Sequence, residues 1–457
     1  MTRTPSAGAA LADQTGGTAP STRLSSWPVT LPLALFPLWW ALGLGALVFS
    51  LAAAAMAVLL VRAHHRGRAL RLPPGFPLWL VFLATVVAGL AVLDLDPVGV
   101  VAAGPTDRIV GAGFRLAQYL AATAVLLYAG NLTRAELPQR RVVNLLAWLF
   151  AVTVAGGFLG LLAGGFEFTS PFELVLPRRV RNDGFVQSLV HPYSAQIMDV
   201  GAGAQSRPAA PWGYTNTWGN NVCLLVPWLA LIVTDRARGR GVRAFGLLVL
   251  AAATVPVVFS LNRGLWVGLA VGAGYAAMRL ALIGRLAALA AVGAAAAAAT
   301  LALALTPLGT VVQTRVDTGK SNGVRAYLSQ LAVDGMAGSP VVGYGSTRTT
   351  LGGRHSITIG ETRDCPRCGN FTIGGNGQLW QLLYAHGAVG TVAYLGFFGY
   401  ALWRFRRDHS PVGIAGGAVI VGSLVAALWY NSLVTPLMLT MIGYALLWRH
   451  NSQGENR

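Results

Sequence analysis

The chain has 457 residues, of which 54% are hydrophobic and 11% are charged, and its mean hydropathy is +0.57. Soluble domains carry about 25% charged residues, so this composition excludes a soluble enzyme, a secreted disulfide scaffold and a disordered chain. Apolar stretches of about 20 residues recur between positions 31 and 448, as membrane-spanning helices require. These runs are long and continuous, which excludes a β-barrel with its short alternating strands.

The net charge of +18 raises the question of a nucleic-acid partner. A nucleic-acid-binding protein gathers its basic residues on one soluble face. Here they stand in short clusters between apolar stretches. We therefore expect no nucleic-acid partner, and the lipid bilayer is the first partner that the composition predicts.

Residues 1–27 are rich in Ser, Thr, Gly and Ala and lack the pattern of a signal peptide, so we expect a disordered cytoplasmic tail. The apolar block 27–61 is too long for one untilted helix, and its Gly43-Leu-Gly45 favours a break into two short helices. Further spans are expected at about 76–93, 109–130, 142–165, 212–234, 244–260, 264–282, 286–306, 377–403, 412–429 and 432–448. The fold class is thus all-α, a polytopic bundle of 11–12 spans over 28–449, with a cytoplasmic tail at 450–457.

Clusters of arginine in alternate connections set the expected orientation. They lie at Arg62–Arg68, Arg134–Arg141, Arg236–Arg240, Arg285 and Arg404–Arg407. By the positive-inside rule these connections are cytoplasmic, and the protein is a multi-pass protein of the cell membrane. Two long extracytoplasmic loops, about 166–211 and 307–376, follow from this topology.

Both long loops are basic, and loops of this length are uncommon without a function. Their cations are Arg178, Arg179, Arg181, Arg207, Arg315, Lys320, Arg325, Arg348, Arg354, Arg363 and Arg367. Two interpretations stay open: solvated surface charge, or an anionic substrate at the outer face. Cys365-Pro-Arg-Cys368 is half of a common zinc site, but on an outer loop a local disulfide is favoured.

Arg263, in Ser260-Leu-Asn-Arg-Gly264, lies in a short connection between two apolar spans. Arginine is costly there unless it snorkels to the headgroups, is paired, or faces a water-filled cavity. Its planar fork suits bidentate contacts with phosphate. Arg207 opens a second polar stretch that runs to Asn216 and leads into the 212–234 span, where a capping role for Asn216 is the structural alternative. Gly343-Tyr-Gly345 predicts a tight turn.

Taken together, these blocks resemble the O-antigen ligase and O-antigen polymerase superfamily of bacterial membranes. Arg207–Asn216 is similar to its Arg-x-x-Gly-x-x-x-x-Pro-Asn block, with alanine in place of the glycine and threonine before the asparagine. The Ser260–Gly264 stretch is similar to its Ser-x-x-Arg-Gly hairpin. The stretch from Arg325 through Gly343-Tyr-Gly345 to Asn376 and Gly387 is similar to its large outer loop and the helix that follows.

The resemblance implies a glycosyltransferase that uses an undecaprenyl-diphosphate-linked oligosaccharide as donor and a glycan or glycolipid as acceptor, at the extracytoplasmic side. It implies no cofactor and no metal. Arg207 and Arg263 would hold the diphosphate, with Arg325 and Arg348 as further candidates and Asn216 and Asn376 as binding residues. Fixed cations aimed at the leaving diphosphate stabilise charge that grows in the transition state.

One position departs from the ligases of this superfamily, which carry His immediately before the asparagine of the third block, where this chain has Gly375. We predict that His355 takes the place of the missing histidine as the catalytic base. His191, Glu361 and Asp364, which also lie in the outer loops, are the alternatives. Alternatively the chain is a polymerase that does not use that histidine. Arg115, early in the 109–130 span, either meets the diphosphate or snorkels.

Two other classes of function stay open at this point. A transporter or flippase of a lipid-linked glycan or other anionic substrate would depend on polar groups deep in spans, such as His386. The structural alternative is a neutral histidine whose ring hydrogen-bonds to a neighbouring backbone group. A structural membrane protein would tolerate replacement of the outer arginines. We expect the glycosyltransferase, either polymerase or ligase.

Overall fold

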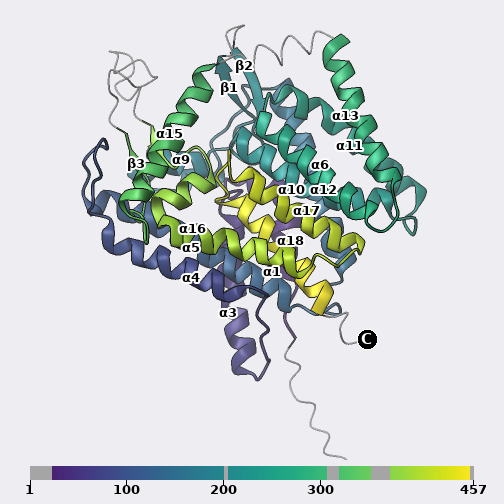
Figure 1. Cartoon of the computed structure of the whole chain (residues 1–457), viewed down its shortest axis with the longest axis horizontal. Helices are drawn as coiled ribbons and strands as arrows, with labels where there is room; N and C mark the ends of the chain where they lie inside the picture. The colour runs from purple at the N-terminus through teal and green to yellow at the C-terminus, as the bar shows by residue number, and fades with distance from the viewer. Residues whose placement is uncertain (1–22, 200–203, 306–318, 351–370, 453–457) are drawn as a thin grey trace, which may run out of the picture.

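The computed structural model describes residues 23–199, 204–305, 319–350 and 371–452. The chain is mostly helical in these ranges (Figure 1). The longer helices are α1 (Trp27–Ala34), α2 (Phe36–Ala41), α3 (Val48–His65), α4 (Phe76–Ala88), α5 (Pro105–Asn131), α6 (Gln139–Leu162), α10 (Thr215–Thr234), α11 (Arg240–Phe259), α12 (Arg263–Ala281), α13 (Ala287–Leu305), α15 (Gly319–Gly338), α16 (Gln378–Arg404), α17 (Pro411–Ala426) and α18 (Thr435–Ser452).

Shorter elements lie in the connections. They are the 3₁₀ helix η1 (Gly89–Val92), the helices α7 (Pro171–Val175), α8 (Arg178–Arg181) and α9 (Gly184–Val190), and the strands β1 (Ala195–Asp199), β2 (Ala204–Pro208), β3 (Arg348–Thr349) and β4 (Thr372–Ile373). β1 pairs antiparallel with β2, and β3 with β4. The long predicted loops are therefore partly ordered, because 166–211 contains a hairpin and 307–376 contains α15.

Seven of the described helices are long and apolar enough to cross a membrane, namely α3, α5, α6, α10, α11, α12 and α16. Two shorter apolar helices cover Phe76–Val92 and Pro411–Ala426. This confirms the helical character that the composition predicts and fits a multi-pass membrane protein, whereas the number of 11–12 spans stays a prediction. The block 27–61 divides into α1, α2 and α3, and its main break falls at Gly43–Gly45, where Gly43 has φ +79°.

The core lies around α18, which is buried along nearly its whole length (Figure 1). A helix that is apolar all round belongs in the interior. α18 packs mainly on α5 and α17, and its Tyr444 ring lies 5.2 Å from the ring of Phe397 on α16. Trp79 on α4 and Trp228 on α10 are among the fully buried side chains of the same core. Removing such rings from water is the largest favourable contribution to this packing.

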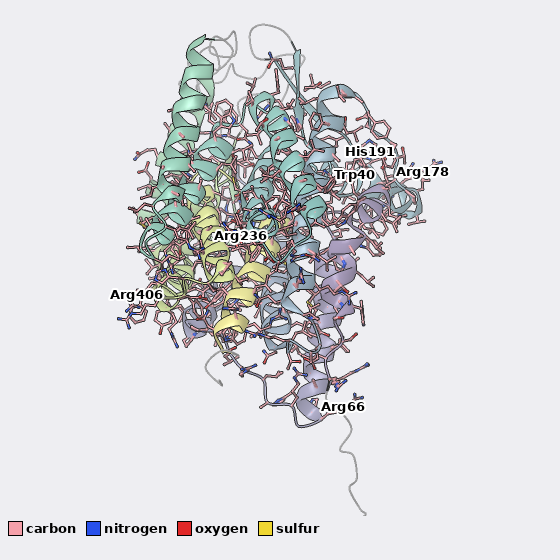
Figure 2. All side chains as sticks on the ribbon, turned by 90° about the vertical axis from the view of Figure 1, so that its right-hand side faces the viewer. Trp40, Arg66, Arg178, His191, Arg236 and Arg406 are labelled. Carbon is pink, nitrogen blue, oxygen red and sulfur yellow. The ribbon has the colours of Figure 1, made fainter. Side chains whose placement is uncertain are left out.

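The connections gather at two ends of the bundle. At one end, which we call the short-loop end, Arg68 pairs with Glu136, Arg238 donates to Asn144, and Arg279 donates to the carbonyl of Asp408. At the other, the long-segment end, the connections 89–104, 163–199, 204–214, 260–262, 339–350, 371–377 and 427–434 contact one another. Arg66 and Arg406 of the short-loop end, at the bottom and the lower left of Figure 2, lie well apart from Arg178 and His191 at its upper right. This division agrees with the alternation of the arginine clusters.

Candidate functional site

A cavity of about 460 Å³ lies at the long-segment end, where four elements meet. We call it the Arg263–Arg325 cavity. It is lined by Arg263, Gly264, Val267, Arg325, Ala326, Ser329, Asn376, Trp380, Leu428 and Trp429. Three of the predicted site residues, Arg263, Arg325 and Asn376, thus come together from α12, α15 and the segment just before α16. Among the described residues the lining holds two arginines and no carboxylate, a balance of charge that favours an anion over a cation.

Arg263 owes its position to an unusual turn between α11 and α12. Leu261 has φ +49°, although it is not glycine and is only 4% exposed. The left-handed conformation costs a non-glycine residue about 1 kcal/mol, and such strain persists only where the surroundings impose it. Arg263 and Gly264 are the first two residues of α12, so the positive end of the helix dipole adds to the guanidinium charge.

Asn262 and Tyr430 hold this turn against its neighbours. The Asn262 Nδ2 donates to the carbonyl of Thr215 at 3.2 Å, and its Oδ1 accepts a short hydrogen bond from the Tyr430 hydroxyl. A Cβ atom on residue 264 would lie 2.5 Å from that hydroxyl oxygen. Glycine therefore follows Arg263 because the phenol ring of Tyr430 occupies the space of a side chain.

Tyr430 lies in the connection 427–434 between α17 and α18, and it is buried. Burial raises the pKa of its phenol, and the nearby Cys223 raises it further, whereas the charges of Arg325 and Arg207 lower it. The phenol therefore stays protonated and donates to Asn262. Tyr430 thus lies close to Arg207 on β2, to Arg325 on α15 and to Asn262 just before α12. These three elements converge around its side chain.

Arg325 is held in place through Asn376. The Asn376 Nδ2 donates to the Ser329 hydroxyl at 2.9 Å and to the carbonyl of Arg325 at 3.3 Å, which ties α15 to the start of α16. Burial lowers the pKa of Arg325, Tyr430 raises it, and the like charge of Arg263 lowers it. Two guanidinium groups that repel each other across a cavity favour an anion with more than one charge.

Arg207 lies behind the turn, outside the cavity lining. It is buried on β2, and its Nε donates to the carbonyl of Ser260 at 2.8 Å. The Thr215 hydroxyl donates to the carbonyl of Arg207 at 3.2 Å. Arg207 therefore braces the chain three residues before Arg263. Asn216, in the same predicted block, is exposed in the first turn of α10.

Arg115 and Arg348 belong to a different cluster. Arg348 is 2% exposed and donates to carbonyls of Leu93, Leu95 and Tyr344 at 3.0–3.3 Å. Burial and the charge of Arg108 lower its pKa. Arg115 donates to the hydroxyls of Ser346 and Thr347 at 2.9 and 2.7 Å. Both arginines hold the segment 344–348, and neither lines the Arg263–Arg325 cavity.

The Gly343-Tyr-Gly345 segment packs against a break in α16. Gly387 interrupts this helix with φ +64°, and the N–H groups of Tyr344 and Gly345 donate to the carbonyls of Tyr384 and Ala385. A Cβ on Gly345 would lie 1.8 Å from the carbonyl oxygen of Gly89. Because the glycines have no side chain, the backbone of this segment can lie directly against the backbones of α16 and η1. Its N–H groups bond to α16 carbonyls that lose their helical partners at the break.

None of the histidines that the structure describes lines the Arg263–Arg325 cavity. His386 is 1% exposed beside the rings of Phe82 and Tyr119, and neither of its ring nitrogens has a hydrogen-bond partner among the described residues. His191 contacts Glu173 with 2.8 Å between Nδ1 and Oε2. His355, Glu361, Asp364 and the pair Cys365 and Cys368 lie outside the described residues.

Sequence reasoning missed Asn262, Tyr430, Trp380 and Trp429 as parts of the site. The position of Asn262 next to Arg263 was a usable signal. Tyr430 lies in a short connection that looked like an ordinary hairpin between two spans, so nothing local marked it.

No known family model matches this chain, and no curated protein matches it in sequence. The resemblance drawn from its three motif blocks therefore stays a prediction. A function has to be argued from the chemistry of the cavity.

Proposed function

We propose that this chain is a membrane glycosyltransferase that moves a glycan from an undecaprenyl-diphosphate-linked donor to a glycan or glycolipid acceptor. The observation that carries the proposal is that Arg263 and Arg325 line one cavity, with no carboxylate among its described lining residues. Polymerase and ligase both fit this description, because they share the donor and differ in the acceptor.

The diphosphate is the part of the donor that this cavity suits. Each guanidinium can make two parallel hydrogen bonds to phosphate oxygens, and two such groups match the two phosphates. As the glycosidic bond breaks, the leaving lipid diphosphate gains negative charge. Cations already fixed by Asn262, Tyr430 and Asn376 would stabilise that charge without reorganisation.

The tryptophans support a position at the level of the lipid headgroups. Trp380 and Trp429 line the cavity, and the Trp380 indole donates to the carbonyl of Leu428 at 3.0 Å. Tryptophan is enriched where the apolar interior of a bilayer meets water, which is also where the diphosphate of a lipid donor lies. With the arginine clusters of the short-loop end in the cytoplasm, the cavity would open at the extracytoplasmic face.

Reconstituted transfer tests the proposal. The purified chain is mixed with undecaprenyl-diphosphate oligosaccharide from its host, and products are read by gel and mass spectrometry. A ladder of repeat units would indicate a polymerase, and a single transfer to an added acceptor would indicate a ligase. Arg263→Ala and Arg263→Lys should each lower the rate at least about 100-fold, as for loss of one oxyanion-stabilising group. Lysine is expected to fail because it keeps the positive charge but lacks the planar guanidinium that makes two parallel hydrogen bonds to phosphate.

Arg179→Ala is the matched control, since Arg179 is an exposed arginine at the same end of the bundle. It should retain the wild-type rate. Full activity of Arg263→Lys would overturn bidentate phosphate binding. Absence of product from folded wild-type protein with its native donor would overturn the glycosyltransferase.

A transporter or flippase is the second candidate. The break of α16 at Gly387 favours it, because it lies beside the buried His386, which has no hydrogen-bond partner within the described ranges. Transporters often place polar groups at helix breaks within the membrane. Proteoliposomes that hold a fluorescent lipid-linked glycan distinguish the two candidates. Movement between leaflets that is lost in His386→Leu and kept in Arg263→Ala would favour transport.

A further inference from the structure

An apolar groove of about 1070 Å³ lies at the short-loop end, between α10, α12 and α17 and beside the start of α13. We call it the α10–α12–α17 groove. Its walls include Leu231, Leu269, Ala276 and Ile414, and on α12 it is bordered by Gly272. A Cβ atom on Gly272 would meet nothing within 4 Å. Small residues on α12 thus leave space between helices that are otherwise packed together.

The groove carries positive charge at one edge. Arg236 follows the end of α10, Arg285 lies between α12 and α13, and His409 precedes α17. Both arginines are exposed, and within the described ranges neither side chain has an ion-pair or hydrogen-bond partner. The lining residues that the structure describes include no Asp or Glu. The Nδ1 of His409 is buried and has no partner among those residues either.

The nearby carboxylates are engaged elsewhere. Asp235 accepts from Arg238 at 3.2 Å, and Asp408 accepts from Asn451 at 2.7 Å and from the N–H of Ser410 at 3.0 Å. Arg279 donates to the carbonyl of Asp408 and to the Tyr275 hydroxyl, both at 2.8 Å. These contacts hold α12 to the connection before α17, so the edge of the groove is preformed.

We propose that the α10–α12–α17 groove binds an anionic phospholipid, with its phosphate at Arg236 and Arg285 and its acyl chains along the apolar walls. The charge pattern selects this occupant. An apolar helix would fill the walls and leave the cations unpaired, whereas a lipid with a negative headgroup satisfies both parts. Basic pockets between spans on the cytoplasmic side are typical sites for such headgroups. This site is independent of the Arg263–Arg325 cavity, which lies at the other end of the bundle.

Native mass spectrometry of the purified full chain tests the proposal. Dioleoyl phosphatidylglycerol and dioleoyl phosphatidylcholine serve as probes, because they share acyl chains and differ in net charge. We expect a preference for phosphatidylglycerol that falls about 30-fold in Arg236→Gln/Arg285→Gln, since each of the two basic residues contributes on the order of 1 kcal/mol of attraction near the headgroups and about 1.4 kcal/mol is a factor of ten. Arg66→Gln/Arg407→Gln removes the same charge from exposed positions of the same end and should leave the preference unchanged.

The apolar half of the groove has its own variant. Gly272→Leu/Ala276→Leu fills the space on α12 and should abolish specific binding of both lipids. An equal loss of preference in the Arg66/Arg407 control would overturn the proposal in favour of general attraction to the charged surface. Retention of phosphatidylglycerol binding in the filled variant would overturn it as well.

A measurement on the wild-type chain covers the case in which the filled variant does not fold. Phosphatidylglycerol with a diazirine in one acyl chain is photolysed in nanodiscs that contain the protein. Crosslinks to α12 near Ala273 and to α17 near Ala415 are expected, because both residues line the groove. Crosslinks that fall evenly over the exposed helices would overturn the proposal.

Discussion

The Nε of Arg207 lies 2.8 Å from the carbonyl oxygen of Ser260, so strand β2 braces the turn that carries Arg263. Both residues are buried, and the contact joins chain segments 53 positions apart. Arg207 therefore does not line the cavity itself. It contacts the backbone of the turn that positions Arg263.

Replacement of Arg207 tests whether this residue positions Arg263. Arg207→Lys removes the Nε–H donor and keeps a positive charge nearby. We expect kcat to fall more than tenfold with little change in KM for the lipid donor, because a displaced Arg263 loses interactions made mainly in the transition state. Steady-state kinetics of the reconstituted reaction check this. A raised KM with unchanged kcat would instead indicate that Arg207 binds the donor directly.

The hydrogen bond from Tyr430 to Asn262 gives a second prediction. Tyr430→Phe leaves the Oδ1 of Asn262 without its donor in a buried place, which costs on the order of 1–3 kcal/mol. We expect a lower unfolding temperature in detergent and a lower transfer rate, since the turn before Arg263 loosens. Tyr400→Phe is the control, because Tyr400 is 40% exposed. Equal behaviour of the two variants would contradict the role of Tyr430.

Hydropathy located the helices well because burial in lipid or core needs long apolar runs. The predicted span 109–130 is α5 (Pro105–Asn131), and 377–403 is α16 (Gln378–Arg404). Gly43-Leu-Gly45 predicted the main break in the first block, since glycine weakens a helix locally. These features depend on residues close together in the chain.

Contacts between distant segments could not be predicted in this way. Arg325 and Arg348 look alike in the sequence, but Arg325 lines the cavity and Arg348 is buried among carbonyl groups. Tyr430 acquires its role only when the connection 427–434 meets the turn before α12. The order of the motif blocks indicated which segments to compare, and the packing alone decides which side chains meet.

Gly345 illustrates a packing contact that one atom would break. Gly345→Ala would put a Cβ 1.8 Å from the carbonyl oxygen of Gly89, in addition to the cost of its φ of +68°. Backbone cannot move aside as a flexible side chain can, so we expect a loss of more than about 3 kcal/mol of unfolding free energy, or failure to fold.

Gly99→Ala separates these two costs. Gly99 has φ +86°, and a Cβ there meets nothing within 4 Å. The control should therefore lose only about 1 kcal/mol for its left-handed backbone. Thermal unfolding of both variants in the same detergent checks the difference. A similar loss in the two variants would show that the contact between Gly345 and Gly89 contributes nothing.

Glu136 gives a pH-dependent prediction at the short-loop end. Its carboxylate pairs with Arg68 at 2.5 Å and accepts from the N–H groups of Leu24 and Thr133 at 2.6 and 2.8 Å. Burial raises its pKa, but these hydrogen bonds outweigh burial and lower the pKa to about 2. An unfolded glutamate has a pKa of about 4.3, so the folded state favours the charged form.

The contribution of Glu136 is therefore fully present above about pH 4.3 and is lost as the pH falls towards about 2. Glu136→Gln should lower the unfolding free energy at pH 7 by about 1–3 kcal/mol, as loss of charge-assisted hydrogen bonds by a partly buried group does. Between pH 5 and about 2 the stability of the variant should fall less steeply than that of the wild type, because glutamine does not titrate. Unfolding temperatures of both proteins across this range measure the effect, with Glu167→Gln as an exposed control. Parallel curves for wild type and Glu136→Gln would contradict the shifted pKa, because the slope of stability with pH reports the difference in bound protons between the folded and unfolded chains.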